Sequence, residues 1–240
     1  MLQPRRHTIA LFSFFLFTLV PLLLSAQTYE RAFGLEIGAH QGGRRIAGGD
    51  LPIQQVERQD SVENGIGGYV LGLIYESRAD KIGFTAGVRY LRTGYEVVEN
   101  GLNGPSIGND FRDEVNAQYL QLPLELNFHQ NITEKDRVLF MLGVAGNIHL
   151  KTVTERTRFL DGVDQGTEII PDDEELNYQP VVLSLNTGIG FDRKLGEDWA
   201  VRVMPYFNFF LQGNIKQDLG QLNRNYYQTG VRVTVKRVFL

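Results

Sequence analysis

The segment Tyr119–Phe128, with the sequence YLQLPLELNF, alternates between apolar and polar side chains. Leucine or phenylalanine occupies every second position, and Gln121, Glu125 and Asn127 lie between them. A period of two residues is that of a β-strand with one apolar and one polar face. The segment therefore predicts a strand whose two faces meet different surroundings.

Seven further segments repeat this period, so the sequence predicts an all-β fold with eight strands. Their apolar rows run over residues 33–39, 69–75, 82–90, 138–150, 181–191, 199–211 and 227–235. Short turns are expected at 77–81, 129–136 and 192–198, and long polar loops at 41–64, 96–114, 152–177 and 212–225. Short and long connections in alternation indicate an antiparallel up-and-down meander. We find no helical periodicity of useful length along these strands and loops.

The volume of a narrow barrel decides which face of the strands points outward. The interior of an eight-stranded barrel is only just filled by its inward side chains, so it cannot enclose all the large side chains of the apolar rows. The strand glycines agree, because nearly all lie on the polar face and only Gly146 lies clearly on the apolar one. Small residues relieve crowding inside a barrel. We therefore predict an eight-stranded antiparallel up-and-down transmembrane β-barrel with its apolar face in lipid.

The polar face predicts a network of charges inside this barrel. The charged members are Glu36, Glu76, Arg89, Glu125, Asp192, Arg202, Arg232 and Lys236, accompanied by Asn127, Asn186 and Asn208. Opposite charges in a confined space satisfy one another, and near balance of signs favours a plug of ion pairs over a selective channel. Barrel closure makes the first and last strands neighbours, so we expect Glu36 to lie near Arg232 or Lys236.

Aromatic and proline residues add detail to the predicted strands. Aromatic side chains gather toward both strand ends, as they do in the girdles at membrane interfaces. Pro123 and Pro205 lack the amide hydrogen that a sheet ladder uses, so we expect a bulge or a locally open ladder at each.

The first 26 residues predict a cleaved export signal. Arg5 and Arg6 precede an apolar run from Ile9 to Leu24, and small residues then favour cleavage after Ala26. The chain has no cysteine, which excludes a lipid-anchored lipoprotein. Residues 27–240 are expected to form one barrel domain in the outer membrane.

Two stretches of the sequence match motifs of a known family. Ser25-Ala26-Gln27 ends the signal, and Tyr119–Leu124 (YLQLPL) is similar to a YLxIPL strand that is followed by glycine-aromatic strands. Through these features, over essentially the whole mature chain, the protein resembles the PorT-like outer-membrane β-barrel family of Gram-negative bacteria. Some members resemble components of a protein secretion and gliding apparatus.

The last strand carries a second resemblance. Gln228, Gly230, Val233 and Val235, with Phe239 penultimate, resemble the signal by which the outer-membrane assembly machinery recognises barrels. The resemblance implies that this machinery is a partner during biogenesis.

Residues with catalytic or ligand-binding chemistry are few. His40, His129 and His149 are candidate general bases, but His129 falls in a predicted turn and the others have no clear serine or paired-carboxylate partner. The run Asp172–Glu175 offers carboxylates to calcium, although acidic loops are usually just solvated. The segment Gly42-Gly43-Arg44-Arg45, with Gly48-Gly49, is predicted to be a flexible extracellular loop whose arginines touch lipopolysaccharide phosphates. We assign no catalytic residue, metal site or cofactor.

Composition narrows the partners. The chain has 24 Lys and Arg against 28 Asp and Glu, and no basic patch interleaved with aromatics, which argues against nucleic acid. The leading hypothesis is a non-enzymatic integral outer-membrane barrel whose long extracellular loops form a surface platform. Its expected partners are outer-membrane lipid, lipopolysaccharide and a protein bound through the loops. A secretion or gliding component, an outer-surface barrel enzyme, a periplasmic lipocalin-like carrier and a pore stay open as alternatives.

Overall fold

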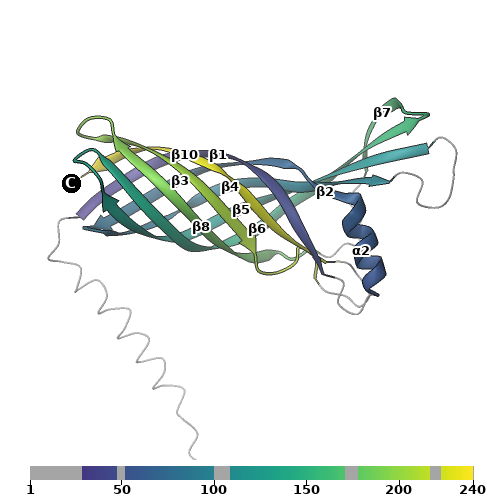
Figure 1. Cartoon of the computed structure of the whole chain (residues 1–240), viewed down its shortest axis with the longest axis horizontal. Coiled ribbons are helices and arrows are strands. Elements are labelled where there is room, and N and C mark those ends of the chain that lie inside the picture. Colours follow the sequence, from purple (N-terminus) through teal and green to yellow (C-terminus); the bar gives the residue numbers. More distant parts are fainter. Residues whose placement is uncertain (1–28, 48–51, 100–108, 171–177, 217–222, 240) are drawn as a thin grey trace, which may run out of the picture.

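Ten strands and one short helix follow one another along the chain in the computed structural model, which describes residues 29–47, 52–99, 109–170, 178–216 and 223–239 (Figure 1). The elements are β1 (Tyr29–Ala47), α2 (Ile53–Val62), β2 (Glu63–Gly65), β3 (Gly67–Ala79), β4 (Ile82–Glu99), β5 (Asn109–Asn131), β6 (Asp136–Leu160), β7 (Val163–Ile170), β8 (Val181–Lys194), β9 (Trp199–Phe210) and β10 (Asn223–Phe239). Among the described residues, no helix is long and apolar enough to cross a membrane.

Eight of these strands close into a ring of antiparallel neighbours. The order is β1-β3-β4-β5-β6-β8-β9-β10, and β10 pairs with β1 from Arg31↔Phe239 to Ala47↔Asn223. Each strand pairs with the next strand of the ring along the chain, so the fold is the predicted eight-stranded up-and-down barrel. The short strands β2 and β7 lie outside the ring and pair with β4 and β6.

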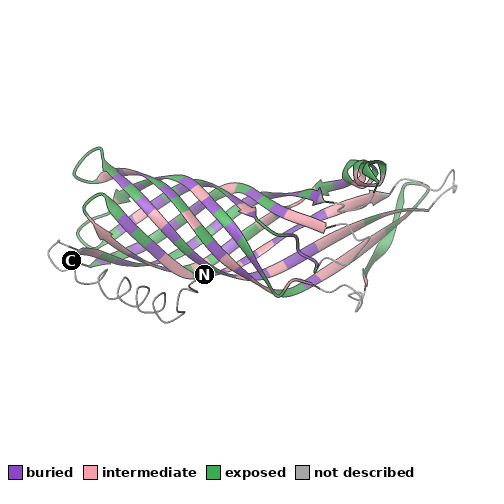
Figure 2. Cartoon of the chain, turned by 90° about the horizontal axis from the view of Figure 1, so that it is seen from below, coloured by how far each residue is buried: buried purple, intermediate pink, exposed green. Residues whose placement is uncertain are grey.

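Burial alternates along every wall strand, as the diagonal bands of Figure 2 show. Leu35 and Leu124 are 66% and 64% exposed, whereas the adjacent Glu36 and Glu125 are 4% and 3% exposed. The apolar rows therefore face outward and the polar rows face the interior, as the volume argument predicts. Aromatic neighbours such as Phe33 and Tyr75, whose ring centres lie 5.0 Å apart, belong to the outer face.

The two ends of the barrel differ. Short connections join β3 to β4, β5 to β6, and β8 to β9 at one end, which we call the turn end. At the opposite end, which we call the loop end, three strands extend into the predicted loops. Strand β4 ends only at Glu99, β5 already begins at Asn109, and β6 ends only at Leu160. The prediction of long loops was therefore wrong in part. Where a strand extends past the membrane, neither of its faces contacts lipid. Its backbone can still pair, but its apolar and polar residues no longer alternate, so the sequence does not mark it as a strand.

The helix α2 is also a departure from the prediction. It lies in the stretch between β1 and β2 and has only three apolar residues, Ile53, Val56 and Val62. So few apolar positions leave no clear helical period in the sequence.

The ladders open beside both prolines. The β4–β5 pairing omits the two positions between Ala86↔Leu124 and Arg89↔Gln121, where Pro123 lies. The β8–β9 pairing omits the two positions between Gly188↔Tyr206 and Phe191↔Val203, where Pro205 lies. In each case the register is unchanged across the gap, so the predicted local opening is confirmed without a bulge.

Candidate functional site

The middle of the barrel holds four buried charges, which we call the central group: Glu36, Arg89, Glu125 and Arg232. Arg89 Nη1 lies 2.6 Å from Glu125 Oε1, and Arg89 Nε lies 2.6 Å from Glu36 Oε1. Arg232 Nη1 lies 3.2 Å from Glu125 and 3.4 Å from Glu36. The closure of β1 on β10 thus places Glu36 beside Arg232 rather than Lys236. Two positive and two negative side chains cancel inside the group.

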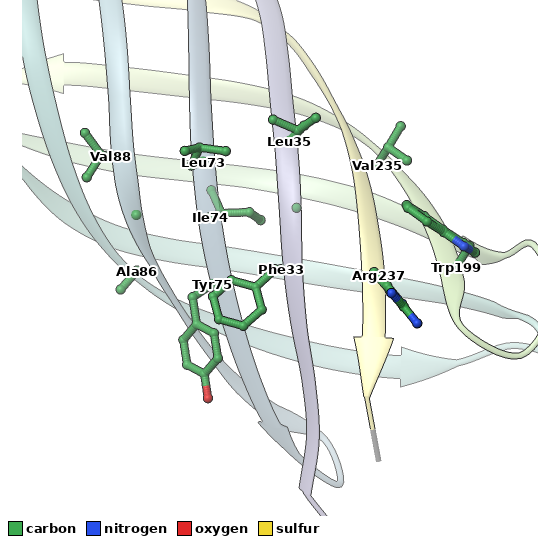
Figure 3. A pocket seen from close by; sticks show the side chains of 12 residues that line it. Phe33, Leu35, Leu73, Ile74, Tyr75, Ala86, Val88, Trp199, Val235 and Arg237 are labelled. Atoms are coloured by element: carbon green, nitrogen blue, oxygen red, sulfur yellow. The ribbon is translucent and has the colours of Figure 1, made fainter.

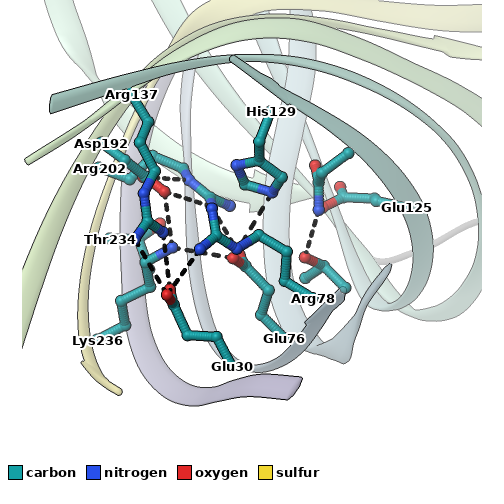
Figure 4. Close-up of polar contacts among 12 residues, drawn as sticks. Glu30, Glu76, Arg78, Glu125, His129, Arg137, Asp192, Arg202, Thr234 and Lys236 are labelled. Atoms are coloured by element: carbon teal, nitrogen blue, oxygen red, sulfur yellow. Dashed lines mark hydrogen bonds and ion pairs between the residues drawn. The ribbon is translucent and has the colours of Figure 1, made fainter. Parts of the chain in front are cut away.

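A second set of four charges, the turn-side group, lies nearer the turn end (Figure 4). It consists of Glu76, Asp192, Arg202 and Lys236. Arg202 donates from Nε to Asp192 Oδ1 at 2.7 Å and lies 2.7 Å from Glu76 Oε2. Lys236 Nζ donates to Asp192 at 2.8 Å and to Glu76 at 3.0 Å. This group is also balanced, so the eight predicted residues form two neutral quartets rather than one continuous network.

His129 points into the turn-side group. This histidine was predicted to lie in a turn, but it lies in β5, is 4% exposed, and its Nε2 is 3.9 Å from Glu76 Oε1. The strand continues three residues past Phe128, to Asn131, so the inward row includes His129. The prediction of a turn position for this histidine was wrong.

Four further charges form a mouth group at the turn end: Glu30, Arg78, Arg137 and Lys194. Arg137 donates two hydrogen bonds to Glu30, at 2.7 and 3.0 Å, and Arg78 donates one at 2.7 Å. Lys194 Nζ lies 3.9 Å from the same carboxylate. Burial acts to raise the pKa of Glu30, but the hydrogen bond from Arg137 and the three positive charges outweigh it and lower that pKa below 4.5.

The mouth group was not predicted from the sequence, because its residues lie beyond the ends of the apolar rows. Glu30 lies six residues before Glu36, Arg78 two residues after Glu76, and Arg137 next to the outward Val138. All three obey the same two-residue period. Extending the period past the aromatic residues would have found them.

An aromatic layer crosses the barrel on the loop side of the charges. We call it the aromatic seal; its members are Val70, Leu91, Tyr95, Ala117, Tyr119, Val182, Phe210 and Tyr226. The Tyr119 and Phe210 ring centres lie 5.3 Å apart and those of Phe210 and Tyr226 lie 5.9 Å apart, both edge to face. These rings come from β5, β9 and β10, so they meet across the lumen. The only signal of this layer in the sequence is that its aromatic residues fall between the positions of the outward apolar row.

At the loop end, two arginines bind one buried carboxylate beside the seal. Glu63 is 4% exposed, Arg224 Nη2 donates to its Oε1 at 2.6 Å, and Arg44 Nε donates to its Oε2. The guanidinium carbons of Arg44 and Arg224 lie 5.3 and 4.9 Å from the ring centre of Tyr95. Burial acts to lower the pKa of Arg224, but Tyr95 and Glu63 outweigh it and raise that pKa.

This rim cluster, Arg44, Glu63, Tyr95 and Arg224, corrects one expectation. The segment Gly42–Arg45 was predicted to be a flexible loop, but it belongs to β1 and pairs with β10 as far as Ala47. Arg44 is buried, and only Arg45 of the two arginines is exposed. The contact with lipopolysaccharide remains a prediction for Arg45 alone. Gly48-Gly49 lies outside the described residues.

Beyond the rim, a sheet of five strands projects from the barrel in the order β2-β4-β5-β6-β7 (Figure 1). Arg156 of β6 donates two hydrogen bonds to Asp113 of β5, at 2.7 and 2.6 Å, and its guanidinium lies 4.4 Å from the Phe111 ring centre. In the part of the chain that the structure describes, β7 pairs with β6 and leaves its other edge open. Val163 and Ile169 on β7 are 61% and 71% exposed.

The remaining histidines have simple contacts. His40 lies inside the barrel with its Nδ1 3.0 Å from the Tyr206 hydroxyl. His149 bonds through Nε2 to Thr152 at 2.9 Å and stacks on Tyr178 with 4.6 Å between ring centres. No three His, Asp or Glu side chains among the described residues gather in a metal-binding arrangement. The acidic run Asp172–Glu175 and the predicted signal 1–26 lie outside the described residues.

The four residues of the predicted assembly signal divide between the two faces of β10. Gln228 and Gly230 face inward, and Val233 and Val235 are 36% and 43% exposed on the outer face. A Cβ added at Gly230 would lie 2.2 Å from the Ala39 carbonyl oxygen, so this glycine allows β1 and β10 to approach closely. Recognition by the assembly machinery remains a prediction.

A ring of eight strands with an apolar outer wall and paired charges inside is the architecture of an integral outer-membrane barrel. The family model described as "Outer membrane protein beta-barrel domain" matches residues 25–209, so the chain belongs to this family of outer-membrane proteins. A search of the curated proteins found no match.

Several solved structures have similar barrels. Neisserial surface protein A is 10% identical, with 87% of this chain and 99% of that chain covered and a TM-score of 0.42. The Escherichia coli outer-membrane protease OmpT is 9% identical, with 90% and 99% covered and a TM-score of 0.47. A major outer membrane protein from Thermus thermophilus is 12% identical, with 87% and 99% covered and a TM-score of 0.42. At these identities and scores, the likeness says nothing about the function of this chain.

Proposed function

We propose that this protein is a non-enzymatic outer-membrane barrel that presents its projecting sheet outside the cell as a platform for another protein. Outer-membrane barrels have short periplasmic turns and longer extracellular connections, which orients the loop end outward. The observation that carries the proposal is the five-stranded projecting sheet, in which the second edge of β7 is open among the described residues. A sheet of this kind holds a fixed shape, whereas a loop would not.

The filled lumen supports a role on the surface rather than in transport. The central and turn-side groups contribute eight charged side chains, each at most 4% exposed. The aromatic seal lies on the loop side of these groups and shares Tyr95 with the rim cluster. Because an eight-stranded barrel is only just wide enough for its own side chains, these layers leave little room for a solute path.

The edge of β7 indicates the chemistry of the partner. An open strand edge offers unpaired backbone N–H and C=O groups to a strand of another chain. Val163 and Ile169 add exposed apolar side chains at the two ends of β7. We therefore propose a protein partner that adds an extended segment along β7 and covers these side chains.

Site-directed photo-cross-linking on whole cells tests the platform. A photoreactive phenylalanine analogue at Ile169 or Val163 is expected to give a discrete adduct with a second protein. Ile132, which is also 61% exposed but lies in a connection at the turn end, is the matched control position. Adducts of the same size and yield from Ile132, or none from β7, would contradict the proposal.

A second candidate function follows from the resemblance of Tyr119–Leu124 to the PorT-like strand. We propose membership of a secretion or gliding apparatus as that alternative. Purification of the intact protein from its native membrane distinguishes the two, because this role requires several envelope proteins to co-purify. A single surface protein cross-linked through β7 favours the platform alone, and conductance steps in a planar bilayer would contradict both.

A further inference from the structure

The outer wall of the barrel is hollowed on both sides of one small residue. Ala86 lies in the outward row of β4 between Phe84 and Val88. A hollow of ≈ 570 Å³ extends from Ala86 across β3, β1 and β10, and its outward side chains are shown in Figure 3. A second hollow of ≈ 580 Å³ extends the other way across β5 and β6 to Leu185 of β8. Both hollows include Ala86 and Tyr75, so they meet along β3 and β4.

The walls of the first hollow are ordered from apolar to polar along the barrel. Leu35, Leu73 and Val88 line its side toward the middle of the barrel, whereas Tyr75, Trp199 and Arg237 line its side toward the turn end (Figure 3). Tyrosine and tryptophan prefer the membrane interface, where the ring is in hydrocarbon and the polar atom meets the headgroups. The polar side of the hollow is therefore at headgroup level.

Two arginines face outward at this level on neighbouring strands. Arg237 of β10 is opposite Phe33 of β1, and Arg31 of β1 is opposite Phe239 of β10, so the two arginines are diagonal neighbours. The guanidinium carbon of Arg237 lies 5.4 Å from the Phe239 ring centre, and its Nη2 lies 3.8 Å from Asp198. Asp198 offsets the positive charge of Arg237, so the pair of arginines keeps a net charge of one to attract an anion.

We infer that the two hollows hold the acyl chains of an anionic phospholipid whose phosphate is bound by Arg31 and Arg237. The apolar hollows match two hydrocarbon chains that diverge around Ala86, and the paired arginines complement a phosphate at the interface. Because the turn end faces the periplasm in an outer-membrane barrel, the lipid belongs to the periplasmic leaflet. This inference goes beyond the proposed platform, which lies at the opposite end, and the two stand or fall separately.

The chain contains one tryptophan, Trp199, and it lines the hollow, so its fluorescence reports on the bound lipid directly. The full mature chain would be refolded into phosphatidylcholine vesicles that contain a small fraction of brominated phosphatidylglycerol. Bromine on the acyl chains quenches a tryptophan in contact with them. We expect brominated phosphatidylglycerol to quench Trp199 more strongly than brominated phosphatidylcholine at the same mole fraction, and added salt to reduce the difference.

Two charge variants and a matched control decide whether the arginines select the lipid. Arg31→Gln and Arg237→Gln are each expected to weaken the preference for phosphatidylglycerol about fivefold, the effect of one arginine near a membrane surface. Arg193→Gln is the control, because Arg193 is 3.7 Å from Asp136 and its side chain is as exposed as that of Arg237, at 60% against 55%, yet it lies on β8 outside the first hollow.

A second pair of variants tests the hollows themselves. Ala86→Leu fills the point where the two hollows meet and is expected to reduce quenching by either brominated lipid. Ala39→Leu is its control, because it adds the same bulk to the outward row of β1 nearer the loop end, outside both hollows. Should Ala86→Leu fail to fold, the exposed arginine variants still decide the question. Equal quenching by both lipids in the unchanged protein, or an equal loss in Arg193→Gln, would overturn the inference.

Discussion

The barrel interior and the projecting sheet contain ion pairs of nearly equal length in very different surroundings. Arg89 lies 2.6 Å from Glu125 inside the barrel, where their side chains are 0% and 2% exposed. Arg158 lies 2.5 Å from Glu168 on the sheet, where the side chains are 63% and 49% exposed. Water screens the outer pair, whereas Arg89 and Glu125 are shielded from water and are bound by each other and by the other two charges of the central group. Distance alone therefore says little about what each pair contributes to stability.

Removing the inner cation is expected to have the largest effect on stability. Arg89→Leu leaves Glu36 and Glu125 with Arg232 as their nearest cation, and we expect the free energy of unfolding to fall by about 3–5 kcal/mol. Arg232→Leu should lower the unfolding temperature in the same direction. Urea unfolding in lipid vesicles, followed by Trp199 fluorescence, measures the loss.

The sheet supplies the matched comparison. Arg158→Leu breaks a pair of nearly the same length and is expected to change the free energy of unfolding by about 0–1 kcal/mol. The double variant Arg89→Leu/Glu125→Leu should recover part of the loss, because it leaves one carboxylate, Glu36, with one cation, Arg232. Equal losses from Arg89→Leu and Arg158→Leu would show that burial is not what separates the two regions.

Two glycines on opposite faces of the wall give the next largest contrast. A Cβ at Gly230 would lie 2.2 Å from the Ala39 carbonyl oxygen and 2.6 Å from His40 Cβ, whereas one at Gly146 would meet nothing within 4 Å. We expect Gly230→Ala to cost about 1–3 kcal/mol through overpacking. Gly146→Ala should be neutral or stabilise by roughly 0.4–1 kcal/mol, since it restricts the unfolded chain. The same unfolding assay compares the two variants. A larger loss of unfolding free energy for Gly146→Ala than for Gly230→Ala would contradict the placement of Gly230 on the inner face and Gly146 on the outer face.

The difference between the two regions also explains what the sequence could predict. Lipid requires one face of each wall strand to be apolar, and the row Leu120–Phe128 therefore revealed the strands, the barrel and the inward charges. Outside the membrane that requirement ends. The extended parts of β4, β5 and β6 have polar residues on both faces, so pairing there depends on backbone hydrogen bonds that leave no two-residue period. Which charges meet across the lumen depends on register, and that is why Glu36 could be placed only near Arg232 or Lys236.

Acid should weaken the turn end through Glu30. Its pKa is lowered in the folded protein by Arg78, Arg137 and Lys194, so its contribution to stability is present above its ordinary pKa of 4.5 and is lost as pH falls through the lower folded value. Unfolding in urea at a series of pH values below 5 measures this slope. Glu30→Gln keeps the size of the side chain and should flatten the slope relative to the unchanged protein. An unaltered slope would mean that Glu30 titrates as it does in the unfolded chain.

The smallest expected effect on stability concerns the edge strand. Val163 and Ile169 are 61% and 71% exposed on β7, so Val163→Ser with Ile169→Ser should change the free energy of unfolding by no more than about 0.5 kcal/mol. The same double substitution should abolish adducts from a photoreactive residue at Gln165, which lies between the two on the same strand. Arg158→Leu on the adjacent β6, which leaves the β7 edge and its apolar side chains in place, should preserve the adducts. If β7 binds a partner, the adducts are lost in the first case alone and stability is kept. Loss of stability with unchanged adducts, or the absence of adducts from the unchanged protein, would contradict the proposal.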